Sequence, residues 1–201
     1  MNGLLDDIET MRKRATHRKV FTVAGPPASG KTTLSRKLAN RLTNCSYLYL
    51  DGIHLDNSIV IEKGLRNRKG SPETSDVNGF AHLLQRLKKR EKIYVPAFDR
   101  DTEHTINCTY PMPGHDDLII VEGNYLLLDE PIWRDLNECW VLTALVEIDL
   151  RLLRRRLIKR WIAQGFDDQE AEAWIETNDL PNAHRTLRNP IPEDITLSMR
   201  N

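Results

Sequence analysis

The sequence predicts a three-layer α/β fold, in which helices cover both faces of a mostly parallel five-stranded sheet and a small lid lies at one edge. Two observations lead to this prediction. Apolar strand-like runs alternate with helical patterns along the chain, and the first run leads through a glycine-containing loop into a helix. At 201 residues, the chain is long enough for one well-buried domain with a small lid or insertion.

The predicted elements follow from hydrophobic spacing. Leu4, Leu5, Ile8 and Met11 recur at helical intervals, so residues 1–18 should contain a short amphipathic helix, over residues 3–14. The run KVFTVAG, residues 19–25, is apolar enough for a buried parallel strand, and leucines four residues apart predict the next helix, over 31–42. Further strands are predicted over 46–51, 116–122, 140–149 and 194–199, and further helices over 76–89, 150–162 and 169–177.

Two polar stretches interrupt this alternation. Residues 52–75 and 96–115 carry many turn residues and are longer than most connections, which favours a functional role at the ligand-binding edge of the sheet. The sequence contains no repeat or linker that would mark a second domain. We therefore expect one domain, residues 1–201, with a lid region at about residues 155–185.

The composition argues against several classes of partner. With 29 basic and 29 acidic residues, the chain lacks the positive charge that non-specific nucleic-acid binding needs. Cys45, Cys108 and Cys139 are widely spaced, which argues against a disulfide framework or a zinc site and favours a reducing cytoplasm. The acidic N-terminal segment is unlike a signal peptide, and no stretch is apolar enough for membrane insertion.

The loop after the first strand has the pattern of a phosphate-binding site. Gly25, Gly30, Lys31 and Thr32 fit the spacing glycine, any four residues, glycine, lysine, serine or threonine. The glycines let backbone N–H groups surround a phosphate at a helix N-terminus, Lys31 can reach the β and γ phosphates, and Thr32 can bind Mg²⁺. We predict that ATP and Mg²⁺ bind here, on Gly25, Pro26, Ala28, Ser29, Gly30, Lys31, Thr32 and Thr33. The alternative is a tight turn without a ligand.

Two carboxylates are expected at the same edge of the sheet. Asp51 ends the second predicted strand and Glu122 ends the third. One carboxylate can help to hold Mg²⁺, and the other can take a proton from an attacking hydroxyl group.

The segment LRLLRRRLIKRW, residues 150–161, places Leu150, Leu153 and Leu157 on one helical stripe and basic residues on the others. Such a run usually forms a solvated face. In the alternative interpretation, Arg156 and Arg160 reach over the triphosphate and neutralise transition-state charge.

Several motifs together resemble one kinase group. They are GPPASGKTTLS, LDGIHLDN, RKGSPETSDV, YVPAFDRD, IIVEGNYLLLD and NDLPNAHRT, in order over about residues 19–190. The sequence resembles the uridine kinase, phosphoribulokinase and bacterial pantothenate kinase group of P-loop kinases. It looks most like the bacterial branch labelled fructose transport system kinase.

This resemblance implies a P-loop NTPase fold and specific roles for residues. Asp51 would be the general base, Lys31 would act on the transferred phosphate, Glu122 would join Thr32 at the magnesium site, and lid arginines, here Arg156 and Arg160, would reach the phosphates. The substrate-side candidates are His54, Asp56, Asp99, Arg100, Asn178, Asp179 and Asn182.

Some positions depart from the pattern of relatives. Gly52, Ile53 and His54 stand where uridine kinases tend to have aromatic residues, and Ser75 also replaces an aromatic residue. His54 could equally be a buried, hydrogen-bonded imidazole. Asp76 is expected to cap a helix, and the tryptophans are expected to serve as packing residues: Trp133, Trp140, Trp161 and Trp174.

The leading hypothesis is an ATP-dependent kinase for a small hydroxylated metabolite, with sugars such as fructose ahead of nucleosides and pantothenate-like alcohols. The alternative is a nucleotide-binding regulatory ATPase attached to a sugar transporter. A nucleic-acid motor is the most distant hypothesis. Whether the N-terminal helix packs on its own core or in a homodimer is left open.

Overall fold

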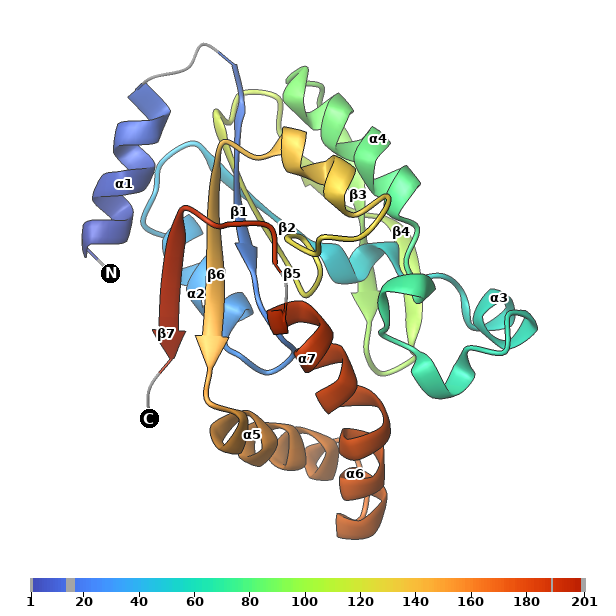
Figure 1. The fold of residues 1–201 in the computed structure, drawn as a ribbon. Helices are drawn as coiled ribbons and strands as arrows, with labels where there is room; N and C mark the ends of the chain where they lie inside the picture. The colour runs from blue at the N-terminus through green and yellow to red at the C-terminus, as the bar shows by residue number, and fades with distance from the viewer. Residues whose placement is uncertain (1, 14–16, 189, 200–201) are drawn as a thin grey trace.

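A parallel sheet forms the centre of the protein (Figure 1). This computed structural model describes residues 2–13, 17–188 and 190–199. Within them, five strands lie in the order β2, β5, β1, β6, β7, and every neighbouring pair is parallel. The strands are β1 Lys19–Ala24, β2 Cys45–Tyr49, β5 Leu118–Gly123, β6 Leu142–Ile148 and β7 Ile195–Met199. The predicted α/β fold and its five-stranded sheet are confirmed.

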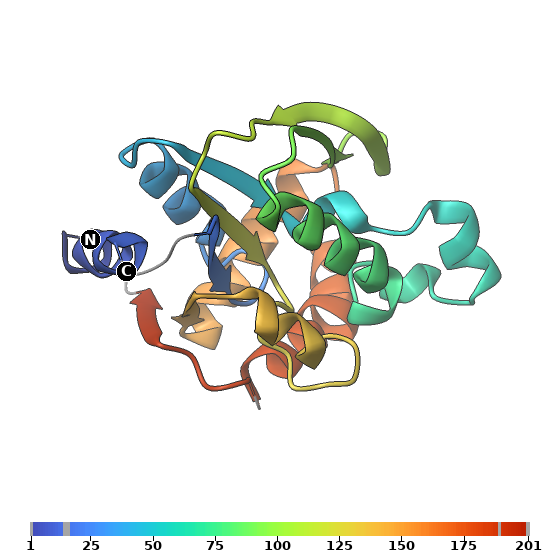
Figure 2. The same ribbon diagram turned by 90° about the horizontal axis from the view of Figure 1, so that it is seen from above.

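Alternating side chains of the central strand divide the apolar core between the two faces of the sheet. Phe21 and Val23 of β1 pack on the face covered by α1 (Asn2–Lys13) and α2 (Lys31–Ala39). Val20 and Ala24 belong to the opposite face, which α4 (Val77–Lys88) covers with Phe80 and other apolar residues. The apolar stripe of α1 therefore packs on its own sheet, close to β7 (Figures 1 and 2).

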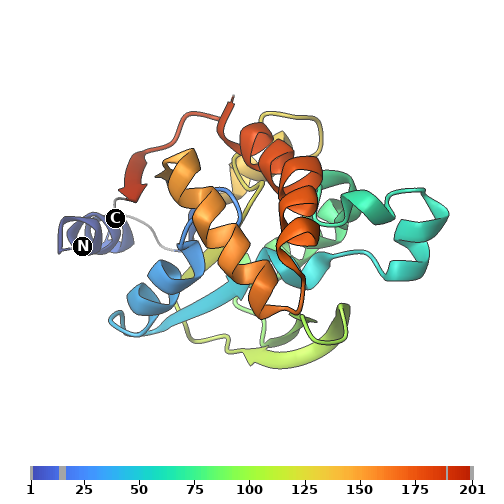
Figure 3. The ribbon, with the colours of Figure 1, turned by 90° about the horizontal axis from the view of Figure 1, so that it is seen from below.

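A group of helices lies beyond the carboxyl ends of β6 and β7 (Figures 1 and 3). It consists of α5 (Leu150–Ala163), α6 (Asp168–Trp174), a π-helical turn (Ile175–Asp179) and α7 (Leu180–Arg188). The last three form one helical run, so the helix predicted over 169–177 is in fact much longer. Leu153 and Leu157 of α5 are fully buried, whereas Leu150 is 40% exposed and does not join the predicted stripe.

The polar insertions contain regular structure that the sequence prediction missed. Within the first, α3 (Asn57–Glu62) begins at Asp56, whose side chain accepts a hydrogen bond from the backbone of Ser58. The second overlaps an antiparallel hairpin of β3 (Ile93–Asp99) and β4 (His104–Met112). Most residues of β4 are exposed, so the strand lacks the alternating apolar pattern by which a sequence reveals a half-buried strand.

The segment around Asp51 also differs from its prediction. β2 ends at Tyr49, and Asp51 lies in a 3₁₀ turn over Leu50–Ile53. Leu50 and Ile53 are buried, and a Cβ atom at Gly52 would come within 2.5 Å of the carbonyl oxygen of Pro96. Packing of this turn under the hairpin therefore ends the strand early and requires glycine after Asp51.

Two smaller expectations concern helix ends and membranes. The Asp76 side chain accepts a hydrogen bond from the backbone N–H of Gly79, so its predicted role as the N-cap of α4 is confirmed. Among the described residues, no helix combines the length and the apolar composition that crossing a bilayer would require.

Candidate active site

The loop between β1 and α2 has the backbone conformation that its glycines predict. Gly25 and Gly30 have positive φ angles of 153° and 101°, and Ala28 has a φ of 57°. A Cβ atom at Gly25 would lie 2.8 Å from the carbonyl oxygen of Val146, so the close approach of β6 also requires glycine there. Gly30 precedes α2, whose first N–H groups have no partner within the helix. The loop thus offers backbone donors at a helix N-terminus, as an anion site does.

Lys31 is buried at the base of this loop. Its Nζ atom donates hydrogen bonds to the carbonyl oxygen of Pro26, at 2.8 Å, and to Oδ1 of Asn124, at 2.9 Å. Burial lowers the pKa of Lys31, and the nearby charges of Glu122 and Asp51 oppose that shift. The fold therefore holds an ammonium group at a fixed place beside the phosphate-binding loop.

Thr32, in the first turn of α2, contacts Glu122 near the end of β5. Thr32 Oγ1 donates to Glu122 Oε1 at 2.8 Å, and Tyr47 OH donates to the same oxygen at 3.3 Å. Burial raises the pKa of Glu122, while the charge of Lys31 opposes this effect. A hydroxyl and a carboxylate are the hard oxygen ligands that Mg²⁺ prefers, so the pair fits this ion.

Asp51 lies at the same edge, paired with a residue of the hairpin turn. Arg100 donates from its guanidinium to Asp51 Oδ2 at 2.7 Å, and the Asp51 side chain is 34% exposed. One carboxylate is thus oriented by a cation and is still accessible to a ligand.

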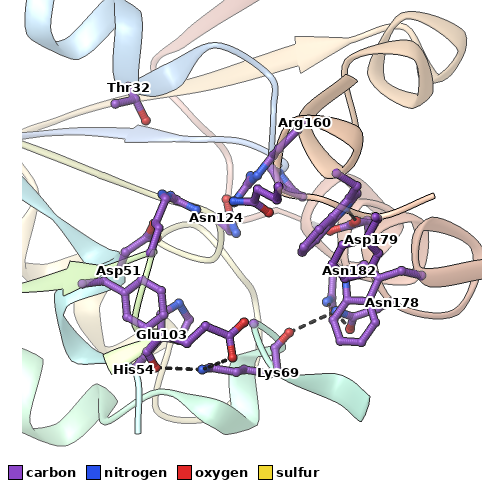
Figure 4. Close-up of a pocket in the computed structure, with 18 of the residues that line it drawn as sticks. Thr32, Asp51, His54, Lys69, Glu103, Asn124, Arg160, Asn178, Asp179 and Asn182 are labelled. Carbon is purple, nitrogen blue, oxygen red and sulfur yellow. Dashed lines mark hydrogen bonds and ion pairs between the residues drawn. The ribbon is translucent and has the colours of Figure 1, made fainter. Parts of the chain in front are cut away.

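A cavity of about 710 Å³ joins these groups. Lys31, Thr32 and Glu122 line one part, and Asp51 and His54 line another. In Figure 4, Asp51 and Asn124 face residues of the helical run 168–188, with Lys69 and Glu103 along a third side. The volume is within the range of small-molecule sites, and several polar groups converge on it.

The helical run contributes three buried polar residues to the cavity. Asn178 Nδ2 donates to the carbonyl oxygen of Lys69 at 3.0 Å, and Asn182 Nδ2 donates to Asn178 Oδ1 at 3.1 Å. Asp179 Oδ2 accepts a hydrogen bond of 2.6 Å from the indole Nε1 of Trp161 on α5. Asn178 and Asp179 lie in the π-helical turn, a feature that occurs often at functional sites.

Some of the site residues predicted from the sequence line the cavity, and others do not. The cavity lining includes Lys31, Thr32, Asp51, His54, Arg100, Glu122, Arg160, Asn178, Asp179 and Asn182. Of the other loop candidates, Gly25, Pro26, Ala28, Ser29, Gly30 and Thr33 lie outside this lining, whereas Pro27, which was not selected, is part of it.

Three candidates have other contacts. Asp56 caps α3, and Asp99 accepts hydrogen bonds from Asp101 N and Thr102 Oγ1 within the hairpin turn. Short polar side chains satisfy local backbone groups in this way, and neither residue lines the cavity. Arg156 donates to the carbonyl oxygen of Ser29 at 3.1 Å, so it contacts the phosphate-binding loop and not the cavity.

The cavity also contains residues that were not selected from the sequence. Asn124 follows Glu122 by two positions in the motif IIVEGNYLLLD, and this position could have identified it as a site residue. Lys69 and Glu103, which form an ion pair of 3.3 Å, come from the two insertions and gave no local signal. Trp161 and Trp174, expected to serve only as packing residues, line the cavity, whereas Trp133 and Trp140 are buried in the core.

Asp179 yields a prediction about stability. Burial raises the pKa of this carboxyl, so the folded protein holds the proton to a higher pH than the unfolded chain does. Above the unfolded pKa of about 4, ionisation therefore destabilises the wild type. We expect Asp179→Asn, which can still accept from Trp161, to have a higher melting temperature at pH 7, with the difference closing below about pH 4. An Asp56→Asn control should show no such gain, and a lower melting temperature of Asp179→Asn at pH 7 would contradict the prediction.

The arrangement matches a solved structure closely. The structure of a protein from Silicibacter sp. TM1040, provisionally described as a fructose transport system kinase, superposes with a TM-score of 0.92 at 36% identity, covering 96% of this chain and 97% of that one. The chain belongs to the P-loop kinase family. This kinase is also 34% identical over 192 residues to the uncharacterized Escherichia coli protein YggC, with 90% of the chain and 78% of that protein aligned.

A second relative is also named as a kinase. A Schizosaccharomyces pombe protein provisionally named a uridine kinase is 29% identical over 195 residues, covering 90% of this kinase and 83% of its relative. No family model matches the chain. Together with the fold, these relatives support a small-molecule kinase.

Proposed function

We propose that this kinase transfers the γ-phosphoryl group of ATP to a hydroxyl group of a small metabolite, with sugars such as fructose as the leading acceptors. One observation carries the proposal: Asp51 and the end of the phosphate-binding loop, Lys31 and Thr32, line the same cavity. A phosphate donor on the loop and a hydroxyl group beside Asp51 would then be close enough for direct transfer.

In this proposal, each charged group has a separate task. Asp51 accepts the proton of the acceptor hydroxyl, and Arg100 holds its carboxylate in place. Lys31 and Arg160 face the charge that develops on the transferred phosphoryl group. The chemistry is mainly positioning and charge stabilisation, which side chains held in place by hydrogen bonds and ion pairs can provide.

Thr32 and Glu122 would hold Mg²⁺, directly or through water. Held there, the ion would supply positive charge that neutralises the phosphates. Among the described residues, no group of three or more His, Cys, Asp or Glu side chains could hold a metal by itself. That is compatible with Mg²⁺, which commonly uses one or two carboxylates together with phosphates and water.

The sugar assignment is supported by the polar, hydrogen-bonding character of the cavity and by the name of the Silicibacter relative. Nucleosides and pantothenate-like alcohols are the next acceptors in this proposal. We place the protein in the cytoplasm, because ATP is available there and Cys45, Cys108 and Cys139 are free thiols. A homodimer is also part of the proposal, although α1 packs on its own core and so provides no support for it.

The test is ADP production by the full chain with MgATP, across hexoses, pentoses, nucleosides and pantothenate. ADP release that depends on one acceptor class would support the kinase and identify that class. ATP hydrolysis that no acceptor changes would instead favour a nucleotide-dependent regulator.

A further inference from the structure

The cations at the acceptor end of the cavity already have partners on the chain. Arg100 pairs with Asp51 at 2.7 Å. Arg66 and Lys69 both pair with Glu103, at 3.1 and 3.3 Å. An anionic acceptor would therefore have to compete with a carboxylate for every one of these three cations.

The charge balance leads to the same conclusion. With Lys31, Glu122 and Arg160 assigned to the nucleotide, the lining retains Arg66, Lys69 and Arg100 against Asp51, Asp101, Glu103 and Asp179, three cations to four carboxylates. If Asp179 is protonated, the balance is three to three, which is still not positive. Burial lowers the pKa of His54, so this imidazole is neutral at pH 7 and adds no cation. The acceptor end has no excess positive charge with which to attract an anion.

Aromatic side chains form the apolar part of the lining. We call Trp161, Phe166 and Trp174 the aromatic wall. The Trp161 ring lies 4.9 Å from that of Phe166 and 5.6 Å from that of Trp174, measured between centroids. The wall offers an apolar surface to a ligand in the cavity.

One polar atom of the aromatic wall has no partner. Nε1 of Trp174 is buried and makes no hydrogen bond with any residue that the structure describes. Buried indole N–H groups usually donate to something, and a ligand in the adjoining cavity becomes that acceptor when the ring turns toward it.

From these observations we propose that the acceptor is electrically neutral, lays an apolar face against the aromatic wall and accepts a hydrogen bond from Trp174. Unphosphorylated sugars and nucleosides fit this description. Phosphorylated sugars, nucleotides and carboxylates such as pantothenate do not. The inference rests on the proposed function, since it concerns the acceptor of the same kinase.

The test uses acceptor pairs that differ in charge but keep their hydroxyl skeleton. These are fructose and fructose 6-phosphate, uridine and uridine monophosphate, pantothenol and pantothenate, and glycerol and glycerate. Calorimetric titration of the full chain without nucleotide measures binding, independently of catalysis. We expect at least one neutral compound to bind, and its anionic counterpart to bind at least tenfold more weakly. An anion that binds as tightly as its neutral counterpart, or no binding by either member of any pair, would overturn the inference.

Two variants test the contacts that the inference assigns to the acceptor. Glu103→Gln frees Arg66 and Lys69 and should raise the affinity for the anionic member at least threefold relative to that for the neutral member. The matched control is Glu62→Gln, which removes an exposed acid of α3 outside the lining. Trp174→Phe keeps a ring but removes the N–H donor, and should weaken binding of the neutral compound about fivefold. If neither variant changes affinity, the assigned contacts are wrong.

ADP production measured in parallel separates this inference from the proposed function. A neutral compound that binds without being phosphorylated would support the neutral acceptor site and count against the kinase assignment of that ligand. Preferred turnover of an anionic acceptor would support the kinase and overturn the inference.

Discussion

Asp51→Asn is expected to reduce acceptor-dependent phosphoryl transfer by about 10²–10⁴-fold, the usual contribution of a general base, and to leave ATP binding intact. Asn keeps the size of the side chain and an oxygen that Arg100 can donate to, so the cavity should keep its shape. What is lost is the group that accepts the hydroxyl proton. The measurement is initial-rate ADP production with the best acceptor, together with calorimetric titration of ATP.

The matched control for this variant is Asp99→Asn. It makes the same chemical change in the hairpin that Asp51 contacts through Arg100, but at a carboxylate that lies outside the cavity lining. Its turnover should stay near that of the wild type. If the two variants retain equal turnover, Asp51 is not the base. If Asp51→Asn loses ATP affinity as well, the residue serves the nucleotide and not the acceptor.

Lys31→Ala should act mainly on the nucleotide. Hydrogen bonds to charged groups contribute about 1.5–3 kcal/mol, so loss of the ammonium group should weaken ATP binding about 10- to 100-fold. Transfer should fall by about 10²–10³-fold, the typical result of removing one donor from developing negative charge. Calorimetry with ATP and single-turnover rates at saturating ATP would measure the two effects separately.

Lys37→Ala is the appropriate comparison, because Lys37 lies on the same helix with its side chain exposed. It removes the same charge from α2 without removing a buried contact. Equal ATP affinity of the Lys31→Ala and Lys37→Ala proteins would refute the assignment of Lys31 to the phosphates. Thermal melts of both variants should accompany the titrations, because loss of Lys31 removes one hydrogen bond from the carbonyl oxygen of Pro26 and one from Oδ1 of Asn124.

The parts of the fold that the sequence predicted correctly are those in which local pattern and burial agree. β1, β5 and β6 are strongly apolar because both faces of the sheet are covered, and the strands can therefore be recognised from the sequence. The β3–β4 hairpin was missed because it pairs only with itself among the described strands and leaves most of β4 exposed. The early end of β2 was missed for another reason: the turn at Gly52 depends on contact with Pro96, which is distant in the sequence.

In the candidate site too, the residues predicted correctly depend on local sequence, and those that were missed depend on distant contacts. Lys31, Thr32 and Glu122 belong to contiguous motifs at strand ends, so chain topology alone brings them to one edge. Asp56 and Asp99 also lie near motifs, but nearby backbone N–H groups occupy them. Lys69 and Trp174 were missed because only the approach of an insertion and a distant helix makes them neighbours of the cavity. Spacing along the chain contains no information about that approach.

The helices beyond the carboxyl ends of the strands contribute Leu153, Leu157, Ile175 and Ala183 to an apolar cluster that also contains Ile148, the last residue of β6. Across the cavity they meet the first insertion through polar contacts, such as that of Asn178 with the carbonyl oxygen of Lys69. Breaking such a contact exposes little apolar surface to water. We therefore expect such polar contacts to open and close at little cost in free energy while the sheet stays still, and to govern acceptor entry and product departure.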